Sequence, residues 1–317
     1  MVEYVLLVAG LAVLVLGAEW VVRGGSAIAA RLGVSPLLVG LTVVSLGTSL
    51  PELAIGIDSA LNDAGPLAVG NVAGTNIVNI LLILGLSAAM VPLALRPQTI
   101  RIDLPVMVGS ALLLWVLAAN GTLSRLDGLI LLVVAIVYTA TVIRLEISGT
   151  PDPVMESEAV EEVPQIGSMW VRSLQLVAGL AVIIVGADWL VDGAVTVAGD
   201  LGVSEAVIGL TVVAIGTSAP ELVTTIVSTI RGNRDLAIGN LIGSSTYNIA
   251  FILGATALVR PLEVTSELVR IDLPLMAAAT LLCVPVFVTG RKVTRVEGGL
   301  FVALYVAYLV WVVVART

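Results

Sequence analysis

Two glutamates lie within long apolar stretches of this sequence. Glu52 ends the segment GTSLPE at residues 47–52, and Glu221 ends the segment GTSAPE at residues 216–221. An ionised side chain at the centre of a bilayer costs at least about 2.5 kcal/mol on insertion scales, and no basic residue lies deep in an apolar stretch to neutralise these two. A protonated pair that only locks helices together would also explain them, but their surroundings favour a binding site for a positive ion.

The residues before each glutamate supply further oxygen atoms. A proline within a helix removes the hydrogen bond to the carbonyl four residues earlier, which frees the carbonyls of Gly47 and Gly216. Hydroxyl side chains lie four and three residues before each glutamate, on the same helix face as its carboxylate; they are Thr48, Ser49, Thr217 and Ser218. Hard cations such as Ca²⁺ bind about 6–8 oxygens of these kinds. The duplicated segment therefore predicts a cation site.

A second pair of polar segments follows, GNVAGTNIVN at 70–79 and GNLIGSSTYN at 239–248. Glycines four residues apart in each segment favour close helix packing. A hydroxyl and an amide, also four residues apart, share one helix face in each segment; these residues are Thr75, Asn79, Ser244 and Asn248. A buried amide needs a partner, and a ring of oxygens around a cation is the best one that this sequence offers. Asn71 and Asn240 are expected to cap or bridge helices.

The composition requires that membrane-spanning helices position these residues. Of 317 residues, 58% are hydrophobic and 12% are charged, with a mean hydropathy of +1.11, whereas soluble domains carry about 25% charge. The apolar runs are continuous and long enough for helices, which excludes the alternating strands of a β-barrel. The first is expected to remain as a helix, because its start lacks the positive region of a signal peptide. We predict an all-α polytopic membrane protein with ten transmembrane helices at residues 2–22, 34–59, 67–90, 102–119, 126–144, 173–191, 204–230, 236–259, 271–288 and 297–315.

The sequence contains one repeat written twice. Residues 40–53 read GLTVVSLGTSLPEL and residues 209–222 read GLTVVAIGTSAPEL, an offset of 169 that needs no gap between residues 17 and 105. The chain is therefore expected to form two homologous five-helix repeats. The first covers residues 1–145 and the second residues 172–317. Residues 146–171 form a linker whose acidic composition predicts a solvated loop.

Five helices per repeat is an odd number, so the second repeat must enter the membrane from the opposite side. The basic residues agree with this inversion, because cytoplasmic loops are rich in Lys and Arg. With both termini outside, 11 of the 15 basic residues lie on the cytoplasmic side. We therefore expect two inverted repeats in a multi-pass protein of the cell membrane, with both termini outside and the linker 146–171 in the cytoplasm.

Several other residues have expected structural roles. Asp103 and Asp272 each precede Leu-Pro at a helix start and follow an arginine by two residues, which predicts local charge balance. Glu19 and Asp188 lie beside tryptophans near span ends, as interface anchors do. Cys283 is the only cysteine, so an internal disulfide or thiolate cluster is impossible and packing is its expected role.

The duplicated motifs resemble the α-repeats of the calcium/cation antiporter superfamily, of which the sodium/calcium exchangers are the best-known members. The chain is similar to the compact prokaryotic type. The resemblance implies a ten-helix exchanger in which the second, third, seventh and eighth helices enclose the ions, while the first and sixth helices slide or tilt to alternate access. It implies a ligand set of Glu52, Glu221, Thr48, Thr217, Ser49, Ser218, Thr75, Ser244, Asn79 and Asn248, with the backbone carbonyls of Ser45 and Ala214.

One position departs from several members of the family, which carry Asp where this chain has Asn248. With Asn79 also neutral, the site offers at most two negative charges. That charge balances one Ca²⁺ or two Na⁺, so the family's usual three-for-one stoichiometry is in question.

We expect a transporter that exchanges Na⁺ for Ca²⁺ by alternating access, with Ca²⁺ bound between Glu52 and Glu221. Ca²⁺/H⁺ exchange on the same two glutamates is an open alternative, because neighbouring carboxylates readily take up a proton. A cation channel gains nothing from inverted halves, and an enzyme would need a nucleophile and base that are not recognisable in a chain without histidine. No cofactor is expected: Ca²⁺ and Na⁺ are substrates. The lipid bilayer surrounds the protein, and the sequence indicates no nucleic-acid or protein partner.

Overall fold

The computed structural model describes residues 2–148, 168–200 and 214–316. Within these ranges eight helices are long and apolar enough to cross a membrane, and a pair of helices bent by 43° makes a ninth span. The expected seventh span, 204–230, is described only from Ala214 onwards. The multi-pass helical fold is confirmed, whereas the count of ten helices stays a prediction.

The elements of the first half are α1 (Val2–Leu32), α2 (Pro36–Val39), η1 (Gly40–Val44), α3 (Ser45–Thr48), α4 (Leu50–Leu61), α5 (Gly65–Ile77), η2 (Val78–Leu84), α6 (Gly85–Met90), β1 (Leu93–Ala94), η3 (Thr99–Asp103), α7 (Leu104–Leu117), η4 (Ala118–Asn120), β2 (Thr122–Leu123) and α8 (Arg125–Ser148). Those of the second half are α9 (Met169–Asp200), α11 (Ala214–Thr217), α12 (Ala219–Ile230), α13 (Arg234–Tyr247), η7 (Asn248–Leu253), α14 (Gly254–Val259), β3 (Leu262–Glu263), η8 (Leu268–Asp272), α15 (Leu273–Gly290), β4 (Lys292–Val293) and α16 (Arg295–Arg316). Apart from η4, which is a 3₁₀ turn, the η elements are π-helical.

Two helices run beyond their expected apolar spans. The first was expected over 2–22 and continues to Leu32, and the sixth was expected over 173–191 and covers Met169–Asp200. The first helix stops before Gly33, whose φ of +67° is the left-handed conformation that ends many helices. Apolar length therefore predicts where the membrane lies, whereas a backbone stop signal decides where this helix ends.

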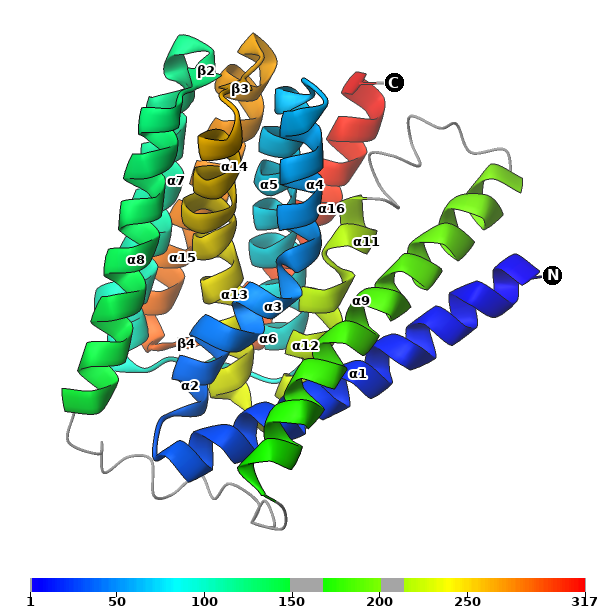
Figure 1. Cartoon of the computed structure of the whole chain (residues 1–317), viewed down its shortest axis with the longest axis vertical. Helices are drawn as coiled ribbons and strands as arrows, with labels where there is room; N and C mark the ends of the chain where they lie inside the picture. The colour runs from blue at the N-terminus through cyan, green and yellow to red at the C-terminus, as the bar shows by residue number, and fades with distance from the viewer. Residues whose placement is uncertain (1, 149–167, 201–213, 317) are drawn as a thin grey trace.

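These two long helices form a closely packed antiparallel pair. Figure 1 shows α1 and α9 lying side by side and crossing the upright helices obliquely. Glycines bring their backbones together: a Cβ on Gly17 would lie 2.8 Å from the backbone nitrogen of Ile183, and one on Gly186 would lie 2.7 Å from that of Leu14. The pair thus joins the first helix of one half to the first helix of the other.

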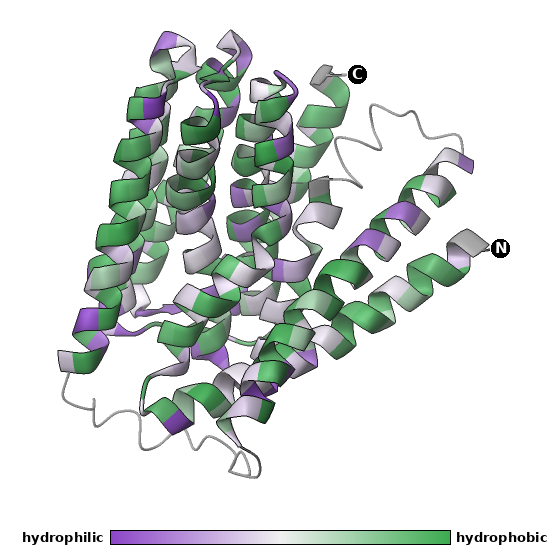
Figure 2. Cartoon of the chain, viewed as in Figure 1, coloured by the Kyte–Doolittle hydropathy of each residue, from purple (hydrophilic) through white to green (hydrophobic). Residues whose placement is uncertain are grey.

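The third and eighth spans lie at the centre of the bundle. In each, 78% of the most apolar window is buried, against 22–44% in the other single-helix spans of the described chain. Figure 2 shows hydrophobic residues along most of α8 and α16 and hydrophilic ones near the ends of the bundle. The outer helices present side chains such as Ile136 and Val314 to the surroundings, with 66% and 76% exposure, as expected of surfaces that face lipid.

Two short strand pairs were not expected from the sequence. β1 pairs antiparallel with β4, and β2 pairs antiparallel with β3. Each pair joins a loop of the first half to a loop of the second, and β2 and β3 meet at the upper end of the bundle in Figure 1. Strands of two residues carry no periodicity in the sequence that could have predicted them.

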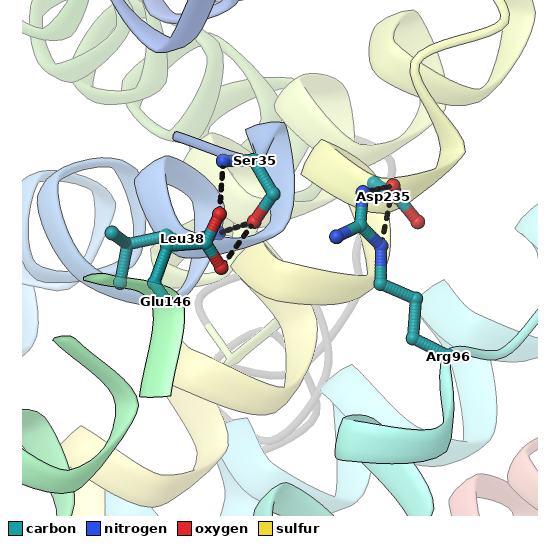
Figure 3. A network of polar contacts seen from close by, with 5 residues as sticks. All are labelled: Ser35, Leu38, Arg96, Glu146 and Asp235. Atoms are coloured by element: carbon teal, nitrogen blue, oxygen red, sulfur yellow. Dashed lines mark hydrogen bonds and ion pairs between the residues drawn. The ribbon is translucent and has the colours of Figure 1, made fainter. Parts of the chain in front are cut away.

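Polar contacts at one end of the bundle join the two halves to each other and hold helices within the first half (Figure 3). Arg96 follows β1, and its Nε donates to Asp235 Oδ2 of α13 over 2.8 Å. Nearby, Ser35 Oγ donates to Glu146 Oε2 over 2.9 Å, so the end of α8 holds the start of α2. Ser35 also caps that start by accepting from the backbone nitrogen of Leu38 over 3.2 Å.

Candidate ion-binding site

The two GTSxPE segments each interrupt a helix at the serine. Ser49 separates α3 from α4 with φ −88° and ψ 9°, and Ser218 separates α11 from α12 with φ −87° and ψ 6°. Pro51 and Pro220 therefore lie in the first turn of a new helix, where the missing N–H removes no helical hydrogen bond. The sequence predicted a kink caused by proline inside the helix; the structure instead has a break that begins two residues earlier and is alike in both repeats.

Glu52 and Glu221 occupy the first turns of α4 and α12, directly after the two breaks. Both side chains are fully buried, with 0% exposure. The positive end of each helix dipole faces its own glutamate, which stabilises a negative charge there. The arrangement can therefore hold two carboxylates in an apolar bundle, provided that positive charge comes to them from elsewhere.

Contacts between the repeats bring the predicted hydroxyls together. Ser49 Oγ donates to Glu221 Oε1 over 3.0 Å. Thr48 Oγ1 lies 3.4 Å from Ser244 Oγ, and Ser244 Oγ donates to the Ser45 carbonyl over 3.4 Å. Residues of the first repeat thus meet residues of the second at the breaks.

The glycines of α13 allow this close approach. A Cβ on Gly243 would lie 2.6 Å from Ser45 Oγ, and one on Gly239 would lie 2.6 Å from the Leu37 carbonyl. The expected packing role is confirmed for these two glycines. It is wrong for their counterparts in the first repeat, where a Cβ on Gly74 would meet nothing within 4 Å and one on Gly70 would meet only a Leu268 side-chain atom at 3.6 Å.

Many polar atoms of this region have no hydrogen-bond partner in the described part of the chain. They include both carboxylate oxygens of Glu52, Oε2 of Glu221, the hydroxyls of Thr75 and Ser218, and the side-chain amides of Asn79 and Asn248. All of these residues are at most 2% exposed. Buried polar groups are nearly always paired, so this concentration of unpaired oxygens indicates a place where the protein ligates something positive.

Asn79 and Asn248 lie at matching places in π-helical turns. Asn79 is the second residue of η2, and Asn248 is the first residue of η7. Such turns occur frequently at functional sites because they change which side chains face inward. The described residues contain no group of three or more His, Cys, Asp or Glu side chains that could hold a metal, so any cation here relies on two carboxylates and neutral oxygens.

The structure supports two members of the expected ligand set, Thr217 and Ala214, less directly than the others. Thr217 is half-buried, whereas its counterpart Thr48 is fully buried. Ala214 is the first described residue of α11, and the carbonyl roles of Ala214 and Ser45 stay predictions.

Asn240 bridges helices, as expected. Its Oδ1 accepts from Thr48 Oγ1 over 3.2 Å, and its Nδ2 donates to Thr225 Oγ1 over 3.1 Å. Thr225 was not predicted as part of this region, although its place four residues after Glu221, on the same helix face as the carboxylate, is a signal in the sequence. The matching Asn71 has an Nδ2 without a partner in the described chain.

Two expected structural roles need correction. Asp103 is fully buried and accepts at Oδ1 from the Tyr138 hydroxyl of α8 over 3.2 Å, so a tyrosine rather than the nearby arginine is its partner. Glu19 accepts from Arg23 over 2.7 Å and from Arg231 over 2.8 Å. Glu19 therefore links α1 to the end of α12 instead of only anchoring a helix at the interface.

Comparisons with known proteins agree with this fold. The family model described as sodium/calcium exchanger protein matches residues 2–144 and 173–314. Sodium/calcium exchanger MaX1 of Methanosarcina acetivorans is 32% identical over an alignment of 347 positions, gaps included, which covers 98% of each chain. Inner membrane protein YrbG of Escherichia coli is 35% identical over 310 residues, covering 96% of this chain and 94% of the relative.

A solved structure of the sodium-calcium exchanger NCX_Mj, soaked with zero Na⁺ and Ca²⁺, matches with a TM-score of 0.84 and 30% identity over 98% of this chain and 99% of that chain. MaX1 and NCX_Mj are named as sodium/calcium exchangers, which are transporters and not enzymes. From the whole-chain family match and the shared fold, this chain belongs to the sodium/calcium exchanger family of membrane antiporters.

Proposed function

We propose that this protein exchanges Na⁺ for Ca²⁺ across the membrane by alternating access, with the ions bound between Glu52 and Glu221. The observation that carries the proposal is the concentration of buried oxygens without hydrogen-bond partners around two buried carboxylates. A protein built only for stability would pair such groups or replace them by apolar ones. The names of MaX1 and NCX_Mj as sodium/calcium exchangers support the same choice of ions.

In this proposal Ca²⁺ lies between the carboxylates of Glu52 and Glu221. Its remaining ligands come from the hydroxyls, amides and carbonyls of the two broken helices and the two central spans. Na⁺ ions use overlapping oxygens. The proposed ligand residues are Glu52, Glu221, Thr48, Thr217, Ser49, Ser218, Thr75, Ser244, Asn79 and Asn248, with the carbonyls of Ser45 and Ala214.

The coupling follows from the charge of the site. One Ca²⁺ or two Na⁺ balance two carboxylates, whereas an empty site leaves two like charges in a medium that does not screen them. We infer that the loaded protein changes access readily and that the empty one does not. The glycine-packed pair α1 and α9 would move across the bundle in that change.

The proposed orientation has both termini outside and the linker 146–171 in the cytoplasm. It is supported by the 11 basic residues of the linker side against four on the other. Arg96, with its partner Asp235, belongs to that richly basic end of the bundle.

The test is ⁴⁵Ca²⁺ uptake into proteoliposomes that contain the purified chain. Vesicles loaded with Na⁺ are diluted into Na⁺-free buffer at clamped pH and voltage, and a parallel set carries only a pH gradient. Uptake that follows the Na⁺ gradient supports the proposal. Uptake that follows only the pH gradient would instead identify Ca²⁺/H⁺ exchange on the same glutamates, and Ca²⁺ flux without any counter-ion gradient would identify a channel.

A further inference from the structure

The buried face of α12 carries an unusual number of hydroxyl groups. Thr224, Thr225, Ser228 and Thr229 lie three, four, seven and eight residues after Glu221, and none is more than 1% exposed. These spacings place all four on the same helix face as the carboxylate. A polar face therefore runs from the central site towards the Arg231 end of the helix.

Three of these four hydroxyls have a structural partner. Ser228 Oγ donates to the Thr224 carbonyl over 2.7 Å, and Thr229 Oγ1 donates to the Thr225 carbonyl over 2.8 Å. Thr225 Oγ1 accepts from Asn240 Nδ2 over 3.1 Å. Thr224 Oγ1 is the exception, because it has no partner in the ranges that the structure describes.

Glu221, one helical turn before Thr224, also has an unpaired oxygen. Its Oε1 is engaged by Ser49, whereas Oε2 has no hydrogen-bond partner among the described residues. The neighbouring helix α6 packs against α12 and contributes Ser87, another fully buried hydroxyl without a described partner. One carboxylate oxygen and one hydroxyl on this face of α12, and one hydroxyl of the neighbouring α6, thus have no partner in the described chain.

The first repeat does not have this arrangement. At the offset of 169, the positions of Thr224, Thr225 and Thr229 are occupied by Ile55, Gly56 and Ala60. Ser59 alone matches the hydroxyl of Ser228. The repeat symmetry that explains the central site therefore does not explain Thr224.

We propose that Glu221 and Thr224 form an additional position for a monovalent cation, one helical turn beyond the central site and in the second repeat only. The inference rests on the proposed function and assigns the cation as Na⁺. Hydroxyls add oxygens but no charge, so a Na⁺ at this position would be one of the two Na⁺ that the two carboxylates can balance. Ca²⁺ prefers more oxygens and more negative charge than this position offers.

The experiment compares the purified wild-type chain with Thr224→Val in proteoliposomes. Valine has nearly the same shape as threonine but lacks the oxygen. Na⁺-driven ⁴⁵Ca²⁺ efflux is measured against Na⁺ concentration, and Ca²⁺/Ca²⁺ exchange without Na⁺ is measured against Ca²⁺ concentration. We expect the half-saturating Na⁺ concentration to rise by about fivefold or more, as for loss of one polar interaction, with a smaller shift in Ca²⁺ dependence and a lower Hill coefficient for Na⁺.

Two further variants serve as controls. Thr224→Ser keeps the hydroxyl and should restore the wild-type Na⁺ dependence. Thr229→Val is the same chemical change on the same helix face, at a hydroxyl already bonded within the helix, and should leave Na⁺ dependence unchanged.

An unchanged Na⁺ dependence in Thr224→Val, or equal shifts for Na⁺ and Ca²⁺, would overturn this inference while leaving Na⁺/Ca²⁺ exchange intact. A wild-type chain that ignores Na⁺ would overturn the proposed function as well.

Discussion

The hydroxyl of Ser49 in the first repeat donates a hydrogen bond to Glu221 Oε1 in the second repeat over 3.0 Å. The reverse relation is absent from the described residues, since Ser218 Oγ and both oxygens of Glu52 have no hydrogen-bond partner there. The two glutamates match in sequence and in backbone position but not in their polar contacts. Glu52 therefore has two carboxylate oxygens available for a cation, and Glu221 has one.

Both carboxylates should be indispensable for transport. We expect Glu52→Gln and Glu221→Gln each to abolish Ca²⁺ uptake, because either change halves the negative charge that balances Ca²⁺ while keeping the side-chain shape. Size-exclusion chromatography in detergent should show folded protein in both cases. Ca²⁺ uptake retained in both variants would remove the proposed site.

Ser49→Ala should have a smaller effect than either glutamine variant. The change removes a buried hydrogen bond to Glu221 and one expected oxygen ligand, so we expect the half-saturating Ca²⁺ concentration to rise by about fivefold to tenfold. Ser110→Ala is the control, since Ser110 is a buried serine of α7 outside this region. Equal effects of the two substitutions would show that Ser49 has only a packing role.

Asn240→Ala should destabilise the protein more than Asn71→Ala. Asn240 makes side-chain hydrogen bonds to Thr48 and Thr225, whereas the Nδ2 of Asn71 has no partner in the described chain. Loss of a buried bridging group costs about 1–3 kcal/mol, which thermal unfolding in detergent should detect as a lower midpoint for Asn240→Ala. A similar midpoint for both variants would contradict a bridging role.

Gly186→Ala should separate α1 from α9. The new Cβ would lie 2.7 Å from the Leu14 backbone nitrogen, so the helices must move apart, whereas a Cβ on Gly199 of the same helix meets nothing within 4 Å. Overpacking of this kind costs about 1–3 kcal/mol. We expect a lower unfolding temperature and slower Ca²⁺ flux for Gly186→Ala, and wild-type behaviour for Gly199→Ala. Identical behaviour of the two variants would mean that the close packing of α1 and α9 is dispensable.

The proposed orientation in the membrane can be tested by introducing single cysteines and labelling them from one side. Cys283 is the only native cysteine and is fully buried, so it gives a low background of labelling by membrane-impermeant maleimides. Ser168→Cys, within the linker 146–171, should react in inside-out vesicles. Thr122→Cys, in β2, should react in intact cells; both positions are exposed. The opposite pattern would invert the orientation.

The residues of the proposed site could be recognised in the sequence because they are marked by local features. A carboxylate, hydroxyls and proline in one apolar segment predict a broken, oxygen-rich helix, and the exact repeat of that pattern predicts that two such helices meet. The break at Ser49, two residues before Pro51, was not predictable in the same way. The position of the break depends on the backbone conformation of a whole helical turn, and the amino-acid composition of the segment does not show that conformation.

The membrane helices, the repeated segments and the two matching glutamates could be recognised from the sequence alone, because hydropathy and repetition are properties of neighbouring residues. How the two repeats differ became visible only in the folded chain. The hydrogen bond from Ser49 to Glu221, the bridge through Asn240 and the strand pairs β1–β4 and β2–β3 all join residues far apart in the chain. Such contacts depend on how whole helices pack, so two nearly identical segments acquire different partners once each is folded against the other.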